Sequence, residues 1–247
     1  MIDSHLQEAL NPPPSQSAID LYDFICSKTR ITCDKVPVAR EDYLSDPYDG
    51  GRHNIHPFFG LARDLYRLLD SIEKLVRQNA TSNIATPSDY FLASKAQSIQ
   101  KSLQKWTAPS QLHHSSPQLI RDSIMAAEAI RWAAKLHLHQ VMAWEASHQT
   151  NQQSMVQNIL DAISHIPPGS PVNGQLLLPL FLAGVTATRK THRLQIEYRI
   201  SLLESSIGMG NIASAHQFLD LAWRRGREKN TNWETFFPRD HPYVVLC

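Results

Sequence analysis

Apolar residues recur at three- and four-residue steps along most of this chain, which is the spacing of amphipathic helices. From His56 to about Val76 they form one face, while charged residues such as Arg63 and Lys74 occupy the other. This spacing predicts a helix. Similar patterns predict further helices over about residues 18–28, 88–106, 117–148, 152–165, 175–188, 192–207 and 212–227.

The longest of these helices opens at Ser116 and Pro117 and meets no helix breaker before His148. Serine is a favoured N-cap, and proline fits the first helical position because its missing N–H would have no partner there. Apolar residues lie on most sides of this helix, and Trp132 and Trp144 fall away from its main apolar face. A helix with this pattern is usually central in a bundle.

Helix breakers divide the chain and set its fold class. Consecutive prolines at 12–14 favour extended backbone, so residues 1–17 are predicted to form a flexible N-terminal arm. Gly208 indicates a left-handed helix end, and Asn211 is the expected N-cap of the next helix. No stretch alternates strictly between apolar and polar residues, which argues against a sheet. We predict an all-α fold, an antiparallel helical bundle or helix-pair array, with residues 18–247 in a single domain.

Composition narrows the class of protein. The 247 residues are 42% hydrophobic and 19% charged, which is typical of a globular chain, and the net charge of +1 gives no reason to expect direct nucleic-acid binding. Three cysteines are too few for a disulfide framework. The N-terminus does not resemble a signal peptide, and the longest apolar run, 176–185, is too short to cross a bilayer. We expect a nuclear or cytoplasmic protein without membrane association.

The familiar catalytic and cofactor motifs are incomplete or missing. Gly208 and Gly210 lack the third glycine and the preceding strand of a dinucleotide fingerprint. His53 and His56 have no third metal ligand nearby. The chain also lacks a Gly-x-Ser-x-Gly elbow, a His-Glu-x-x-His pair and a Walker lysine loop, which argues against the common hydrolase, protease and nucleotide-hydrolysing classes. We therefore expect neither a cofactor nor a metal.

Several side chains of the longest helix are candidates for chemistry or binding. Arg131 and Glu145 fall on its apolar face, where an unpaired charge is costly, so each needs an ion-pair partner on another helix or a polar cavity. His137 lies beside them. The aromatic residues Trp132, Trp144 and Tyr198 would line a ligand pocket or fill a core equally well.

Three segments carry a family resemblance. They are Ala-Ile-Arg-Trp-Ala-Ala-Lys-Leu-His-Leu-His at 129–139, Leu-Pro-Leu-Phe-Leu-Ala-Gly at 178–184, and the segment from Leu203 through Gly208 to Ala215, which is followed by Trp223. In this order and spacing they resemble the C-terminal regulatory domain of fungal zinc-cluster transcription factors, over about residues 56–247. The resemblance implies an all-α fold of antiparallel helices, a nuclear location, and a domain that holds effectors or partners.

The chain also departs from the pattern of that family. Such regulators normally carry an N-terminal six-cysteine cluster that holds two zinc ions, next to basic residues that contact DNA. Cys26 and Cys33 are the only candidates here, so neither zinc binding nor direct DNA reading is implied. Either an upstream module has been removed or the chain is a stand-alone relative, and Met1 favours the second interpretation.

Two functions from different classes fit these features. The first is a regulatory domain that binds a small-molecule effector, a second copy of itself or a related transcription factor, without turnover. The alternative is a repurposed stand-alone enzyme of fungal secondary metabolism, a small-molecule cyclase or isomerase. Arg131, His137 and Glu145 would then act on the substrate, and Trp144 would form a stacking wall. A scaffold that pairs with full-length relatives is a third hypothesis.

Overall fold

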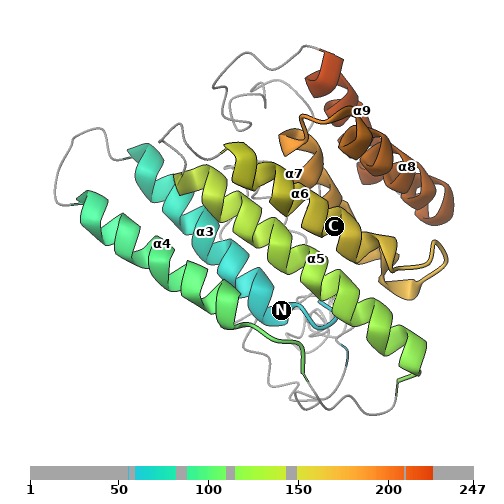
Figure 1. Cartoon of the computed structure of the whole chain (residues 1–247), viewed down its shortest axis with the longest axis horizontal. Coiled ribbons are helices and arrows are strands. Elements are labelled where there is room, and N and C mark those ends of the chain that lie inside the picture. The colour runs from blue at the N-terminus through green and yellow to red at the C-terminus, as the bar shows by residue number, and fades with distance from the viewer. Residues whose placement is uncertain are drawn as a thin grey trace, which may run out of the picture.

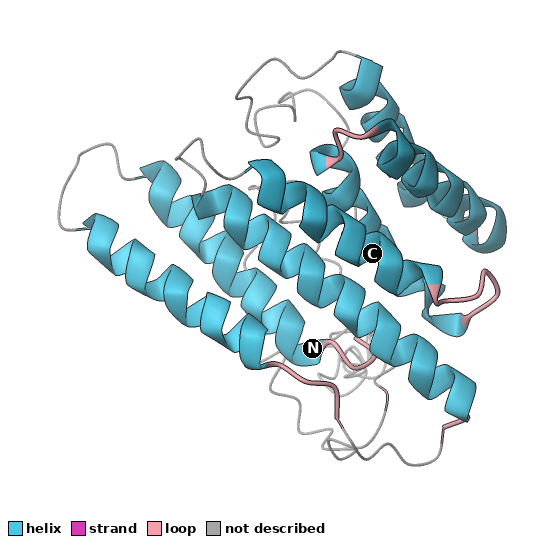
Figure 2. Cartoon of the chain, in the orientation of Figure 1, coloured by secondary structure: helices cyan, strands magenta, loops and turns pink. Residues whose placement is uncertain are grey.

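Every regular element in the described part of the chain is a helix, which confirms the predicted all-α fold (Figure 2). The computed structural model describes residues 55, 59–81, 88–109, 115–142, 149–208 and 210–224. Its elements are α3 (Arg63–Thr81), α4 (Ser88–Lys105), α5 (Pro117–Met142), α6 (Gln149–Ser164), the 3-10 helix η1 (Pro171–Gln175), α7 (Leu177–Thr186), α8 (Lys190–Ile207) and α9 (Gly210–Arg224). The predicted arm at 1–17 and the predicted helix at 18–28 lie outside the described residues.

Two helix-end signals in the sequence are confirmed. The backbone N–H of Leu119 donates to the hydroxyl of Ser116 at 3.2 Å, so this serine caps α5 as expected. Gly208 ends α8 with φ of 66°, a left-handed conformation that glycine adopts without steric cost. The prediction for Asn211 is wrong, because α9 begins at Gly210 and places this residue inside the first turn.

The start of α3 also differs from the prediction. The helix begins at Arg63 rather than His56, although the apolar pattern starts earlier. The chain turns just before it: the N–H of Ala62 donates to the carbonyl of Phe59 at 2.8 Å, and Gly60 has φ of 55°. Phe59 is nonetheless buried, so a residue of the turn continues the apolar face of the helix.

Successive helices pack as antiparallel pairs around α5, which has 26 residues and is the longest of the described helices (Figure 1). The pairs are α3 with α4, α5 with α6, and α8 with α9. Helix α5 contacts α3, α4, α6, η1 and α7, while α7 in turn contacts α8 and α9. The predicted central position of the longest helix is therefore confirmed, and α7 connects the α5 layer to the α8–α9 pair.

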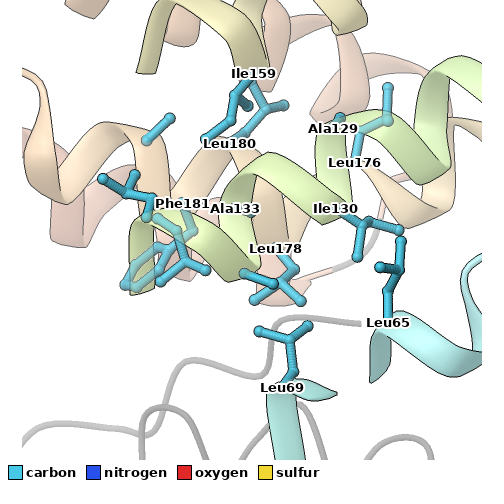
Figure 3. Packing of buried hydrophobic residues seen from close by; sticks show 14 of the residues in the cluster. Leu65, Leu69, Ala129, Ile130, Ala133, Ile159, Leu176, Leu178, Leu180 and Phe181 are labelled. Carbon is cyan, nitrogen blue, oxygen red and sulfur yellow. The ribbon is translucent and has the colours of Figure 1, made fainter. Parts of the chain in front are cut away.

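The core includes residues of all the described α-helices, and part of it lies where α3 and α7 face α5. Leu65 and Leu69 of α3 point toward Ile130 of α5 and Leu178 of α7 (Figure 3). Burial of one such side chain contributes about 1.5–3 kcal/mol to folding. Nearly every residue of α7 is buried, and Pro179 is tolerated because first-turn N–H groups have no acceptor within the helix. Helix α7 has ten residues, and none of the described helices is long and apolar enough to cross a membrane.

Polar side chains fix the segment between α6 and α7. The hydroxyl of Ser170 donates to the buried carboxylate of Asp122 at 2.6 Å, and the side-chain amide of Gln118 donates to the other carboxylate oxygen at 2.6 Å. Arg199 of α8 donates to the carbonyls of Ile163 and Ile166, both at 2.8 Å. Ile163 lies in the last turn of α6 and Ile166 just beyond it, where carbonyls lack the regular i+4 donor of a helix. The link is therefore bound to both α5 and α8.

Helix α9 approaches α7 closely at Gly184. A Cβ atom at this glycine would lie 2.7 Å from both methyl groups of Leu219, well inside van der Waals contact. The indole N–H of Trp223 donates to the carbonyl of Gly184 at 3.0 Å. The second segment of the family resemblance thus meets the C-terminal end of the third, and the missing side chain at Gly184 permits the contact.

We predict that Gly184→Ala lowers the free energy of unfolding by about 1–3 kcal/mol, the usual cost of an extra methyl group in a packed core. Urea denaturation followed by circular dichroism measures the change. Gly210→Ala is the matched control, because no atom lies within 4 Å of a Cβ at that position. Equal stability of the two variants would show that the α7–α9 contact is not tight.

Candidate functional site

A cluster of charged and aromatic side chains lies on the partly exposed side of α5. Its members are Glu128, Arg131, Trp132 and Lys135, which follow one another at helical spacing, and we call them the central-helix surface. All four are half-buried, whereas the opposite sides of the helix are packed into the core. Two of the residues selected from the sequence, Arg131 and Trp132, are therefore brought together.

Arg131 has partners on two helices. Its Nε and Nη2 donate to one carboxylate oxygen of Glu128, at 2.9 and 2.7 Å. Its Nη1 reaches the carbonyl of Leu103 in the last turn of α4, at 3.4 Å. The expected ion pair with another helix is instead an i,i+3 pair within α5. The contact between helices is made to a carbonyl at a helix C-terminus, where a cation is favourable.

Two cations border the indole ring of Trp132. The ammonium of Lys135 lies 4.1 Å from the ring centroid, and the guanidinium carbon of Arg131 lies 5.3 Å from it. Burial lowers the pKa of Lys135, the positive charge of Arg131 lowers it further, and Glu128 opposes the change. This surface therefore offers an aromatic face with an amine and a guanidinium beside it, a combination suited to planar or anionic groups.

His137 lies on a different side of α5 and is fully buried. Its Nε2 is 2.6 Å from Oε1 of Glu73 on α3, so the pair joins two helices inside the core. A hydrogen-bonded imidazole with no exposed surface does not reach a ligand that arrives from solvent. Sequence reasoning missed Glu73, although its position four residues after the buried Leu69 is a signal, because a carboxylate on an apolar helix face requires a partner.

A second polar cluster joins α5, α6 and the end of α7. The side-chain amide of Gln140 donates to the hydroxyl of Thr186 at 2.6 Å. The amide of Gln153 donates to the Thr186 carbonyl at 2.9 Å, and its oxygen accepts from the N–H of Thr188 at 3.2 Å. These bonds satisfy backbone groups that α7 leaves open at its C-terminus, so the cluster is structural.

His192 of α8 extends that cluster. Its Nε2 is 2.9 Å from the amide oxygen of Gln157 on α6, and the side chain is buried. Burial lowers the pKa of His192, Arg189 lowers it further, and Asp161 opposes the change. The imidazole is therefore held in the neutral state more strongly than in the unfolded chain.

The remaining candidates are not part of these clusters. Tyr198 has 61% of its surface exposed on the outer helix α8, so its ring does not line an enclosed site. Trp144 and Glu145 lie outside the described residues. Within the described ranges, no group of three or more histidine, cysteine, aspartate or glutamate side chains is placed to hold a metal ion.

Comparison with known families supplies the assignment. The model of the fungal specific transcription factor domain matches residues 15–247 of this chain. The chain belongs to that family. No curated protein and no solved structure matches it. The assignment confirms the resemblance and extends it upstream from about residue 56 to residue 15.

Membership in the fungal specific transcription factor family indicates a regulatory role and suggests a nuclear protein. The three segments that carry the family resemblance have structural roles in this chain. Arg131 bonds to the end of α4, Gly184 admits α9, and Gly208 ends α8. These residues of the three segments thus make contacts between helices or end a helix.

We predict that Glu73→Ala lowers the free energy of unfolding by about 1–3 kcal/mol, because it removes the carboxylate bonded to buried His137. Glu73→Gln keeps an acceptor at this position and has a smaller effect. Chemical denaturation measures both variants. Lys74→Ala, next to Glu73 but on the exposed side of α3, changes stability by less than about 0.5 kcal/mol. A similar loss in all three variants would contradict the importance of the pair.

Stability should also depend on His192 below neutral pH. In the folded chain its pKa is depressed from 6.5, so just below that value the unfolded chain binds a proton that the folded chain does not. The free energy of unfolding therefore rises with pH through this window and levels off above 6.5. In His192→Gln this rise is smaller, and the difference from the parent is constant above about pH 7.5. Parallel curves at all pH values would contradict the assignment.

Proposed function

We propose that this chain is the effector- or partner-binding regulatory domain of a fungal transcription regulator, and that it binds through the central-helix surface on α5. The observation that carries the proposal is the family match over residues 15–247. The exposure of side chains on α5 supports this choice of binding surface. Glu128, Arg131, Trp132 and Lys135 are charged and aromatic groups that the central helix leaves half-exposed.

The chemistry of this surface supports binding. Tryptophan and arginine are the residues that most often dominate interface energetics, since they combine a large contact area with directed hydrogen bonds. Here Glu128 fixes the guanidinium of Arg131, so little side-chain entropy remains to be lost on binding. The surface is thus preorganised. A small-molecule effector or a segment of a related transcription factor would contact the indole of Trp132 first.

Binding without turnover is also favoured over the enzyme alternative. Of the three polar residues selected as possible catalytic groups, His137 is fully buried against Glu73, and Arg131 is engaged by a carboxylate and a helix end. Neither arrangement leaves a reacting atom open to a substrate.

We expect Trp132→Ala to reduce regulation when the chain is fused to a heterologous DNA-binding module and assayed with a reporter gene in a fungal host. A loss of roughly fivefold or more corresponds to the removal of one aromatic interface contact. Tyr198→Ala, which removes another exposed aromatic ring but on α8, should leave the reporter unchanged. Equal effects of the two substitutions would place the binding surface elsewhere.

Native mass spectrometry separates the regulatory function from the enzymatic one. The purified chain is incubated with a small-molecule extract of its source organism, and the extract is profiled before and after. A specific adduct without change in the extract supports effector binding. Conversion of one compound into an isomer or another product would establish the cyclase or isomerase alternative instead.

A further inference from the structure

The start of α8 carries a cluster of positive charges. Arg189 and Lys190 are exposed, and Arg193 completes the first turn, half-buried. Within the described part of the chain, none of these three side chains forms an ion pair. Arg193 instead donates to the carbonyl of Ala187 at 3.0 Å. The whole chain has a net charge of only +1, so this cluster is a local excess of positive charge.

The end of the helix adds to that positive potential. Arg189 is the N-cap of α8, and its side chain makes no capping hydrogen bond. The N–H groups of the first turn lie at the positive end of the helix dipole and attract anions. Helix α7, which precedes the cluster, has no acidic residue, and Glu197 is the first acid along α8. Neither of these helices therefore places a carboxylate in the first turn.

Apolar groups lie beside the charges. Leu194 follows Arg193 in sequence and has 54% of its surface exposed. The guanidinium carbon of Arg193 lies 5.7 Å from the ring centroid of Trp223, so the last turn of α9 reaches the same place, as expected for an antiparallel pair (Figure 1). Arg224 of that turn is already paired with Asp220 at 2.6 Å. We call the following five residues the α8 corner: Arg189, Lys190, Arg193, Leu194 and Trp223.

We propose that the α8 corner binds an acidic peptide segment of a partner protein, in which bulky apolar residues lie beside aspartate or glutamate. Its carboxylates pair with Arg189 and Lys190 and accept from the first-turn N–H groups, while its apolar side chains pack on Leu194. Hydrogen bonds between ionised partners are stronger than those between neutral ones. The local excess of positive charge also steers an acidic segment toward this corner.

The exposed leucine favours a peptide over a nucleic acid. A phosphate backbone offers no apolar group that covers Leu194, and binding to a duplex ordinarily uses a broad basic face with many phosphate contacts. Here the unpaired cations are confined to one turn. Glu197 is exposed further along α8 and would repel a polyanion that continued in that direction. A short peptide places its carboxylates at the first turn and ends before that acid.

This inference goes beyond the proposed function and does not rest on it. Helix α8 packs on α6, α7 and α9, whereas the central-helix surface belongs to α5. The two proposals are tested by different substitutions and different readouts. Failure of the reporter experiment on Trp132 leaves the α8 corner intact, and failure of peptide binding at α8 leaves the reporter experiment intact.

The test measures binding of a fluorescein-labelled peptide, Asp-Leu-Asp-Glu-Phe-Asp-Leu-Glu, to the full chain by fluorescence anisotropy. Two matched peptides separate charge from apolar contact: one has asparagine and glutamine in place of the acids, and one has serine in place of leucine and phenylalanine. We expect the first to bind at least about tenfold more weakly, because it keeps no charge for the cations. The second should bind about threefold more weakly or less tightly still, because it loses the contact with Leu194.

Charge reversal on the chain locates the binding. The double variant Arg189→Glu and Lys190→Glu should weaken binding of the acidic peptide roughly tenfold or more, because attraction becomes repulsion at both positions. Both side chains are exposed, so the fold is kept, which circular dichroism verifies. The matched control is Lys101→Glu with Lys105→Glu on α4, which changes the net charge equally at exposed positions and should alter binding by less than about twofold.

A third substitution tests the apolar part of the site. Leu194→Ser should weaken binding of the acidic peptide and leave binding of the serine-containing peptide unchanged. Equal losses in the α8 and α4 double variants would overturn the proposal, because the attraction would then follow net charge alone. A tighter complex with a DNA duplex or with phosphatidylserine vesicles than with the acidic peptide would overturn it too, as would equal binding of all three peptides.

Discussion

The burial of almost all of α7 and of the broad apolar face of α5 is the constraint that the other helices satisfy. A helix that is apolar around most of its circumference is stable only when neighbours cover it, and α3, α4, α6, α8 and α9 provide that cover. The same burial makes an unpaired charge or polar group costly, and the buried acid groups of the described core are paired. Asp122 accepts from Ser170, and His137 pairs with Glu73. Only one side of α5 is open to solvent, so the candidate binding residues of this helix lie together on that side.

Two arginines of this bundle hold helix ends in place through hydrogen bonds to carbonyl groups. Arg131 and Arg199 each bond to carbonyl groups at the end of a neighbouring helix, α4 in one case and α6 in the other. Such carbonyls lack an intrahelical donor, and a guanidinium supplies several N–H groups in a fixed plane. The bundle thus uses its arginines to fix the relative positions of helix ends. Arg131 has this packing role, and its positive charge also lowers the pKa of Lys135.

The sequence predicted the described part of the fold better than the site. Helical periodicity located the helices, and Ser116 and Gly208 marked two ends correctly, because these signals depend on neighbouring residues only. The pairing of His137 with Glu73, 64 positions apart in sequence, depends on how α3 lies against α5 and has no local signal that names the partner. The pair of Arg131 with Glu128 was readable from i,i+3 spacing, but the expectation favoured another helix. The environment of Lys135 depends on the burial of its helix face, which periodicity does not measure.

The close approach at Gly184 has a consequence for how this family varies. Leu219 fills the space that a side chain at position 184 would need, so neither position is free to drift by itself. A larger residue at 184 is compatible with the same helix arrangement only if the methyl groups of Leu219 move aside or a smaller residue replaces Leu219. The two positions should therefore covary among relatives in which α9 packs on α7. Where both residues have changed, the distance between these two helices should differ.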